Sequence, residues 1–344
     1  MAEPALLDSA PVPPTGSAGS LRLVVARIAG RTRVVDLECT GPVQVLRCQH
    51  LDGHAPDIAS VIVASPSGGV LQGDRLRIEV EVRAGARLVL ETQSATRLYR
   101  MPDRPARIEA RFAIEAGGWL EYVPDPYIPF AGSDTTIDTH LIVDPTAAVL
   151  FGEVVAAGRV ARGEVFGMTR FASTLTAVRP TRELLFTDTT LLEPAAALTD
   201  PGIMGGHRSV GSLFAIASGL DRGVLRAGLS PDTSNCFAGA STLPNETGSW
   251  LRVLAFDPAE ARAVVQSGGL PREGLVEAFF SGLGVTSVPW SHGPLLDPGT
   301  RVAGPAIIRE PTTTIVVPPG SAAVVTPLGN YLLEPSAEAG DPPA

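Results

Sequence analysis

Regular alternation of apolar and polar residues is the dominant pattern of this chain from about residue 21 onward. Between residues 75 and 83 the apolar side chains alternate with charged ones such as Glu79 and Glu81. The same alternation recurs over residues 107–115. Because successive side chains of a β-strand point to opposite faces, each stretch is typical of a strand with one buried face.

Further strands are predicted from shorter apolar or β-branched runs that Gly, Pro, Asp or Asn clusters separate. They lie at 21–28, 32–38, 58–64, 86–92, 135–143, 164–176, 183–192, 210–217 and 249–256. With 36 glycines and 31 prolines, most connections should be turns. The predicted fold is therefore mainly β, with stacked, mostly antiparallel sheets in a β-helix-like or sandwich arrangement and a few short helices. Periodicity alone does not decide between a sandwich and an open stack.

Helical patterns are few, and they suggest how the chain is divided. Short helices are predicted at 146–157, 258–266 and 272–283. Beyond residue 284 the composition changes to proline- and glycine-rich sequence with short strand-like runs at 312–317 and 322–326. The resulting prediction is a disordered tail at 1–18, a β domain at 19–266, a helix and linker at 267–295, a second β segment at 296–336 and a disordered tail at 337–344.

Composition and charge narrow the classes of function. The chain is 44% hydrophobic, which is enough to form a sizeable core, and its net charge of −9 would repel phosphate backbones. The first twenty residues have neither the positive charge nor the apolar run of a signal peptide. No stretch of about 18 apolar residues occurs. We expect a cytoplasmic protein that binds neither nucleic acid nor membrane.

Known catalytic and metal-binding patterns are weak or missing. The glycine-rich loop at 65–74 ends in Asp74 and a strand, not in the Lys-Ser/Thr and helix of a phosphate-binding loop. The histidines show no HExxH spacing, and GxSxG does not occur. The sequence therefore predicts no catalytic site.

Two stretches contain soft metal ligands in spacings that match no established site. One holds Cys48, His50 and His54, and the other holds Met204 and His207. For both, an ordinary structural role is the alternative. The three cysteines lie far apart with no CxxC, so neither a disulfide framework nor a zinc knuckle is predicted.

Several carboxylates lie next to glycine, proline or apolar runs instead of in acidic surface blocks. If they fall near turns between strands, they could line a water-filled passage; the alternative is that each faces solvent, as most Asp and Glu residues do. They are Asp74, Glu121, Asp125, Glu153 and Glu164.

Four strings in order resemble the urease accessory protein family UreD, also called UreH. They are SPSGGVLQGD, ETQSATRLYR, EYVPDPYIPFAGSD and GEVVAAGRVARGEVF, with GPVQVLR upstream and SWLRVLAF downstream. Together they extend the resemblance over roughly residues 19–260. The stretch before the first string departs from the family pattern, because it lacks the histidine expected around IASVIVA, and the resemblance therefore does not support a metal contact there.

The resemblance implies a scaffold that inserts nickel into urease without turnover. It would dock on apo-urease and recruit the helical accessory protein F, which in turn receives the nickel-carrying GTPase G. A homodimer within the accessory complex is consistent with this role. No cofactor would be tightly bound, because the nickel ion is in transit through an internal tunnel and suits exchanging oxygen ligands.

On this reading two sets of residues become site candidates. The transient nickel path is assigned to the carboxylates Asp74, Glu121, Glu153 and Glu164. A proline-stiffened apolar segment is assigned to core packing first and to a partner interface second, because rigid surfaces lose little entropy on binding. Its interface candidates are Tyr122, Pro126, Tyr127, Ile128 and Phe130.

The C-terminal stretch resembles a different group of proteins. Residues 300–331 contain GPAII and PTTTIVVPPG followed by a terminal GN, as in the closing segment of hydantoinase A, oxoprolinase and acetone carboxylase proteins. This resemblance gives the alternative function, a non-catalytic or amidohydrolase-related subunit of a hydantoinase-type system. A plain β-rich binding module is the third possibility.

Overall fold

The computed structural model describes most of the chain. The described residues are 16–46, 48–50, 57–194, 197–217, 236–267, 273–280, 284–293, 296–309, 314–328 and 330–335. The chain divides into two compact units, residues 1–269 and 270–344. No helix among these described residues is long and apolar enough to cross a membrane.

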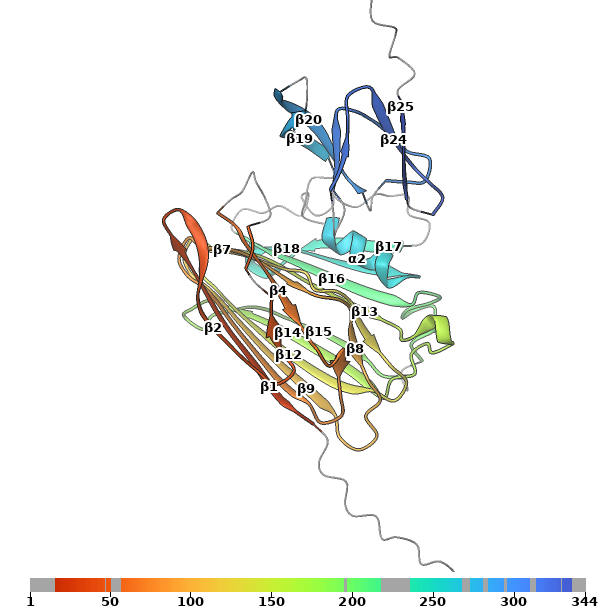
Figure 1. Ribbon diagram of the computed structural model, residues 1–344. Coiled ribbons are helices and arrows are strands. Elements are labelled where there is room, and N and C mark those ends of the chain that lie inside the picture. The colour runs from red at the N-terminus through yellow and green to blue at the C-terminus, as the bar shows by residue number, and fades with distance from the viewer. Residues whose placement is uncertain are drawn as a thin grey trace, which may run out of the picture. The chain divides into compact units, whose positions relative to one another are not determined.

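Two β-sheets that pack face to face form the first unit (Figure 1). Sheet 1 has seven strands in the order β15 (Leu184–Leu192), β14 (Arg170–Val178), β12 (Asp134–Val143), β9 (Ala106–Ile114), β6 (Arg75–Val82), β1 (Ala18–Ile28) and β2 (Arg31–Thr40). Sheet 2 runs in the order β17 (Cys236–Thr242), β18 (Gly248–Ala255), β16 (Ser209–Ile216), β13 (Ala148–Ala156), β10 (Trp119–Tyr122), β7 (Arg87–Thr92), β4 (Ala59–Ala64) and β3 (Gln44–Val45). Beside this path lie the short strands β5 (Gly69–Val70), β8 (Thr96–Leu98) and β11 (Tyr127–Pro129). The prediction of a mainly β fold is confirmed.

The central strands of both sheets are parallel, so the prediction of mostly antiparallel sheets is wrong. In sheet 1, β6 pairs in parallel with β1 and β9, and β12 pairs in parallel with β9 and β14. In sheet 2, β4, β7, β10 and β13 are likewise parallel. The turns after β6, β9 and β12 carry the chain from sheet 1 to sheet 2. The result is a β-helix-like coil, with antiparallel strands toward the sheet edges.

The space between the sheets holds the main core. Its centre is a group of aromatic rings from both sheets, with centroid distances of 5.1 Å between Phe112 and Tyr122 and 5.6 Å between Tyr122 and Phe151. Phe112 is fully buried, as are Leu88 and Leu120. Burial of these side chains supplies most of the driving force that holds the sheets together.

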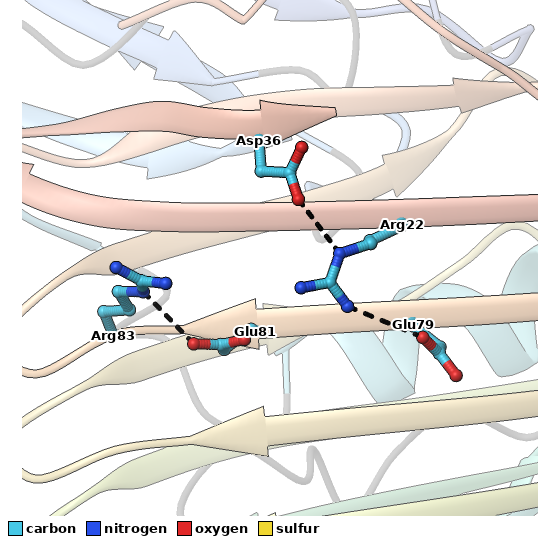
Figure 2. Close-up of polar contacts among 5 residues, drawn as sticks. All are labelled: Arg22, Asp36, Glu79, Glu81 and Arg83. Atoms are coloured by element: carbon cyan, nitrogen blue, oxygen red, sulfur yellow. Dashed lines mark hydrogen bonds and ion pairs between the residues drawn. The ribbon is translucent and has the colours of Figure 1, made fainter. Parts of the chain in front are cut away.

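Charged residues cover the outer face of sheet 1. Arg22 on β1 pairs with Asp36 at 2.9 Å and with Glu79 at 3.8 Å, while Arg83 pairs with Glu81 at 3.1 Å (Figure 2). These side chains are partly exposed, so each pair adds little stability. The charged side chains of β6 lie on this outer face, which accounts for the alternation predicted over residues 75–83.

The predicted helix at 146–157 is strand β13, so this prediction is wrong. Its residues are apolar on both sides because one face packs between the sheets and the other lies under helix α2 (Pro258–Ser267). A strand buried on both faces shows no alternation and is easily mistaken for a buried helix. The helix predicted at 258–266 is confirmed as α2.

The second unit consists of two small sheets. One has the order β19 (Glu273–Phe280), β20 (Gly284–His292), β22 (Ala306–Arg309) and β23 (Thr314–Val317), and the other β21 (Arg301–Ala303), β24 (Ser321–Val325) and β25 (Tyr331–Pro335). The helix predicted at 272–283 is wrong, because β19 pairs antiparallel with β20 across a short connection. Tertiary pairing overrides a weak helical pattern in so short a stretch.

Candidate functional site

Glu153 lies inside the first unit, between the two sheets. Its neighbours Val154 and Leu150 face the α2 side of sheet 2, so Glu153 faces sheet 1. There the Oγ of Ser173 on β14 donates a hydrogen bond to its Oε2 at 2.6 Å. Burial raises the pKa of the Glu153 carboxyl to about 7, while the hydrogen bond opposes that rise. The carboxyl thus titrates near neutral pH in the protein interior.

Tyr122 and Tyr127 line the same interior cavity as Glu153. The cavity also includes Thr139 of sheet 1 and Gly152 beside Glu153. Burial raises the pKa of both tyrosines, so their hydroxyls remain protonated. Two neutral hydroxyl groups near one carboxylate can exchange hydrogen bonds with it or with an ion's water shell.

A second hollow adjoins this cavity. Tyr122 and Tyr127 line it too, and its other end is lined by polar residues of the loops around β4 and β7, including Ser65, Thr92 and Ser94. The two hollows share four lining residues, Ile78, Ile108, Tyr122 and Tyr127. The two hollows therefore lie next to each other between the sheets, with these four side chains forming part of the wall of each.

The proline-stiffened segment contributes mainly to the interior. Tyr122 is 8% exposed and Pro126 is also buried, whereas Tyr127, Ile128 and Phe130 are half-buried. This burial favours the packing role that the sequence suggested first. The predicted partner interface remains a prediction, and only the half-buried residues offer surface for it.

Glu121 lies on the opposite face of β10 from Tyr122. It faces the same side of sheet 2 as Val123, which packs in the cluster beneath α2. Burial raises the pKa of the Glu121 carboxyl to about 7, and the negative charge of Glu91 contributes to the rise. The sheet thus separates Glu121 from Glu153.

Asp74 is almost completely buried and carries a set of hydrogen bonds. Its Oδ1 accepts bonds from the backbone N–H of Ser17 at 2.8 Å and from the Ser17 hydroxyl at 3.1 Å. Its Oδ2 accepts a bond from the N–H of Leu71 at 2.8 Å. The carboxylate fastens the start of β1 to the glycine turn before β6, and it is not among the residues that line the interior cavities.

Glu164 is joined to Phe130 through Arg159. The Arg159 guanidinium forms a two-pronged ion pair with the Glu164 carboxylate and lies 4.0 Å from the centre of the Phe130 ring. Glu164 also accepts a bond from the N–H of Ala131 at 3.2 Å. These contacts hold the pKa of the Glu164 carboxyl below its usual value, with the Arg159 hydrogen bond as the largest cause. The structure thus brings one predicted path residue next to one predicted interface residue.

Known proteins resemble this chain over most of its length. A family model described as UreD urease accessory protein matches residues 17–276. Urease accessory protein UreD 2 of Streptomyces griseus is 34% identical over 245 residues, which are 70% of this chain and 84% of that one. Urease accessory protein UreD of Yersinia pseudotuberculosis is 33% identical over 270 residues, covering 77% and 83%.

The chain belongs to the UreD urease accessory protein family. The UreD protein of Photorhabdus laumondii is a further relative, 31% identical over 257 residues that cover 73% of this chain and 80% of that one. A second model, described as the hydantoinase/oxoprolinase C-terminal domain, matches residues 290–328. Both resemblances predicted from the sequence are confirmed.

The cysteine, histidine and methionine residues that the sequence suggested as metal ligands do not form a common site among the described residues of this UreD-family protein. The His50 ring lies 2.9 Å from the carbonyl oxygen of Thr32, and the His207 ring 2.8 Å from that of Met204, whose side chain is buried in the core. Cys48 packs against the main core, and His54 lies outside the described residues. No group of three or more His, Cys, Asp or Glu residues suited to a metal ion occurs in the described part of the chain.

Sequence reasoning missed the polar residues that accompany Glu153. Ser173, Asp188 and Arg252 lie on three different strands, far from Glu153 in sequence. A charged residue at an inward position of an otherwise apolar strand was the available signal, as at Arg252 in SWLRVLAF. Without the strand order, nothing in the sequence places these four residues together.

Proposed function

We propose that this UreD-family protein is a cytoplasmic scaffold that inserts nickel into apo-urease without catalysing a reaction itself. In this role it docks on apo-urease and links it, through the helical accessory protein F, to the GTPase G that carries nickel. Family membership supports the urease accessory part of the role. The proposal includes no tightly bound cofactor, and nickel is the cargo of the scaffold.

The position of Glu153 is the observation that best supports nickel transfer through this protein. A carboxyl group whose pKa burial raises to about 7 lines a small interior cavity, and a second hollow next to that cavity reaches the loops around β4 and β7. Buried ionisable groups are costly and concentrate at functional sites. A carboxylate that is ionised only part of the time binds a divalent ion weakly, and weak binding suits a relay, because a relay must release its ion.

The other three predicted path residues are supported unequally. Glu121 shares the raised pKa of Glu153 but lies on the other face of sheet 2. Asp74 and Glu164 have their oxygens engaged by backbone N–H groups or by Arg159. We therefore propose Glu153 as the main interior ligand of the passing ion.

Gene deletion followed by a urease assay tests the proposed function. In a host that makes urease, loss of the gene should leave urease protein present but inactive and without nickel, and the full chain supplied in trans should restore activity. Full activity and normal nickel content without the gene would refute the scaffold role. The alternative, a hydantoinase-type subunit, rests on the match over residues 290–328 and predicts copurification with a hydantoinase partner instead.

A further inference from the structure

One ion pair connects the edge regions of the two sheets. Arg252 on β18 donates hydrogen bonds of 2.7 and 2.9 Å to the two carboxylate oxygens of Asp188 on β15. The same guanidinium contacts the Thr190 hydroxyl at 3.4 Å and lies 5.5 Å from the centre of the Trp250 ring. One guanidinium nitrogen, Nη2, donates to both oxygens, so the contact is a charge-assisted hydrogen bond shared between them.

The ion pair is the next polar contact beyond Glu153 along the inner faces of the sheets. On sheet 2, Ser212 pairs with Glu153 on one side and with Arg252 on the other. Arg252 therefore lies two strands from Glu153, a backbone separation of about 10 Å given the usual strand spacing. On sheet 1, Ser173 pairs with Thr190, two residues from Asp188. The charges of Asp188 and Arg252 both act on the Glu153 carboxyl, in opposite directions.

Arg252 also borders a hollow at the open edge of the first unit. That hollow is lined by β15 and β17 residues, including Leu191 and Phe237, together with Trp250 and Arg252. The side chains of Arg252 and Asp188 are 29% and 24% exposed, between the exposure of surface and core residues. The pair thus lies between the edge hollow and the interior that contains Glu153.

We propose that Arg252 acts as a latch at the edge side of the space between the sheets. While the Arg252 guanidinium is paired with Asp188, divalent cations cannot bind the Asp188 carboxylate. When the guanidinium leaves Asp188, a cation that crosses the interior can bind the carboxylates of Asp188 and Glu153 in turn. Removing one member of a partly buried pair leaves the other charge uncompensated, and an entering cation can then replace it. This inference rests on the proposed nickel-delivery function, whose regulation it describes.

Nickel binding by the purified full chain tests the latch without any partner protein. The probe is nickel chloride in competition with a chromophoric chelator at pH 7.5. Arg252→Met keeps an unbranched apolar side chain at this position but removes the guanidinium and its charge, so the variant should bind nickel at least about tenfold more tightly than the native chain. Arg252→Lys keeps the charge and should leave the affinity unchanged.

The double variant Arg252→Met with Asp188→Asn is the matched control, and the gain in affinity should vanish in it. If Arg252→Met does not fold, as judged by circular dichroism melting, Arg252→Gln replaces it with the same expected gain. An unchanged affinity in the folded charge-removing variant, or a gain that persists in the double variant, would overturn the latch. Because this assay contains no urease, its outcome is separate from that of the gene deletion, which tests the proposed function.

Discussion

At the scale of single residues, the carboxyls of Asp74 and Glu153 differ in how many hydrogen bonds their oxygens accept. Asp74 accepts three hydrogen bonds and has no shared cavity with Glu153. Glu153 accepts a hydrogen bond from Ser173 and lines an interior cavity. A fully satisfied carboxylate stabilises a turn, whereas a partly satisfied one retains oxygens that can bind a passing ion.

Replacing Asp74 by Ala should therefore damage folding more than nickel transfer. The substitution leaves the N–H groups of Ser17 and Leu71 without their acceptor, at a cost of about 2–3 kcal/mol in the free energy of unfolding. Urea denaturation measures this loss, with the exposed Glu38→Ala as control. If the Asp74→Ala variant were as stable as the native chain but impaired in nickel transfer, Asp74 would instead be a residue of the nickel path.

Glu153→Gln should stabilise the protein at pH 8 and have little effect on stability near pH 4. In the folded chain the pKa of this carboxyl is about 7, above its ordinary value of 4.5. The carboxyl therefore stays protonated to a higher pH in the folded state than in the unfolded state. Stability is therefore lost as pH rises from about 4.5 to about 7, by an amount on the order of 3 kcal/mol. Glutamine removes that loss and can still accept the Ser173 hydrogen bond.

The measurement is the urea midpoint of native and Glu153→Gln chains between pH 4 and pH 8. The difference between the two should grow with pH and level off above about pH 7. A constant difference across this range would contradict the prediction, because it would mean that the Glu153 carboxyl has the same pKa in the folded and unfolded chains. Glu38→Gln, an exposed site on β2, supplies the pH-independent control.

At the scale of elements, the sequence predicted strands well wherever one face is exposed. Strands β6 and β9 alternate because their outer residues meet solvent, and both were found at the expected positions. Strand β13 was missed because neither of its faces is exposed. Of the candidate site, the sequence named Glu153, Tyr122 and Tyr127, but it did not show that they share a cavity. Asp188 and Arg252 were missed because their proximity depends on strand order, which no local pattern contains.

Helix α2 is held close to sheet 2 by glycines that leave room for it. A Cβ added at Gly211 would lie 2.8 Å from side-chain carbons of both Val253 and Val265, and one at Gly152 would lie 2.9 Å from Val265. Val265 is fully buried. The close approach of helix and sheet thus requires the smallest residue at these two positions.

Gly211→Ala should lower the free energy of unfolding by about 1–3 kcal/mol through overpacking against Val265. Adding Val265→Ala opens space for the new methyl group, so the double variant should be less destabilised than the sum of the two single changes. Gly239→Ala is the matched control, because a Cβ there meets nothing within 4 Å. Strict additivity in urea denaturation would contradict the packing described for α2.

At the scale of the whole molecule, the two compact units correspond to two family resemblances. The UreD match ends at residue 276, just beyond the first unit, and the hydantoinase-type match lies entirely within the second. The second unit has its own small core, formed by Ala306, Ile308, Val317 and Ala323. Nickel delivery is proposed for the first unit alone.

Ala323→Asp should therefore disrupt the second unit and leave urease activation in cells intact. A charge placed at this fully buried position costs several kcal/mol, which is more than a small core can tolerate. Val154→Asp, at a buried position of β13, is the matched change in the first unit and should abolish activation. Equal loss of urease activity in both variants, at equal protein level, would assign the second unit a part in activation.

The central claim is that nickel reaches urease by way of the interior carboxyl of Glu153. The most direct test is the nickel content of urease purified from deletion cells that are complemented with the native chain, with Glu153→Gln or with Glu38→Gln. The account predicts full loading with the native and Glu38→Gln chains, and strongly reduced loading with Glu153→Gln although that variant still copurifies with apo-urease. Full nickel loading with Glu153→Gln would contradict it.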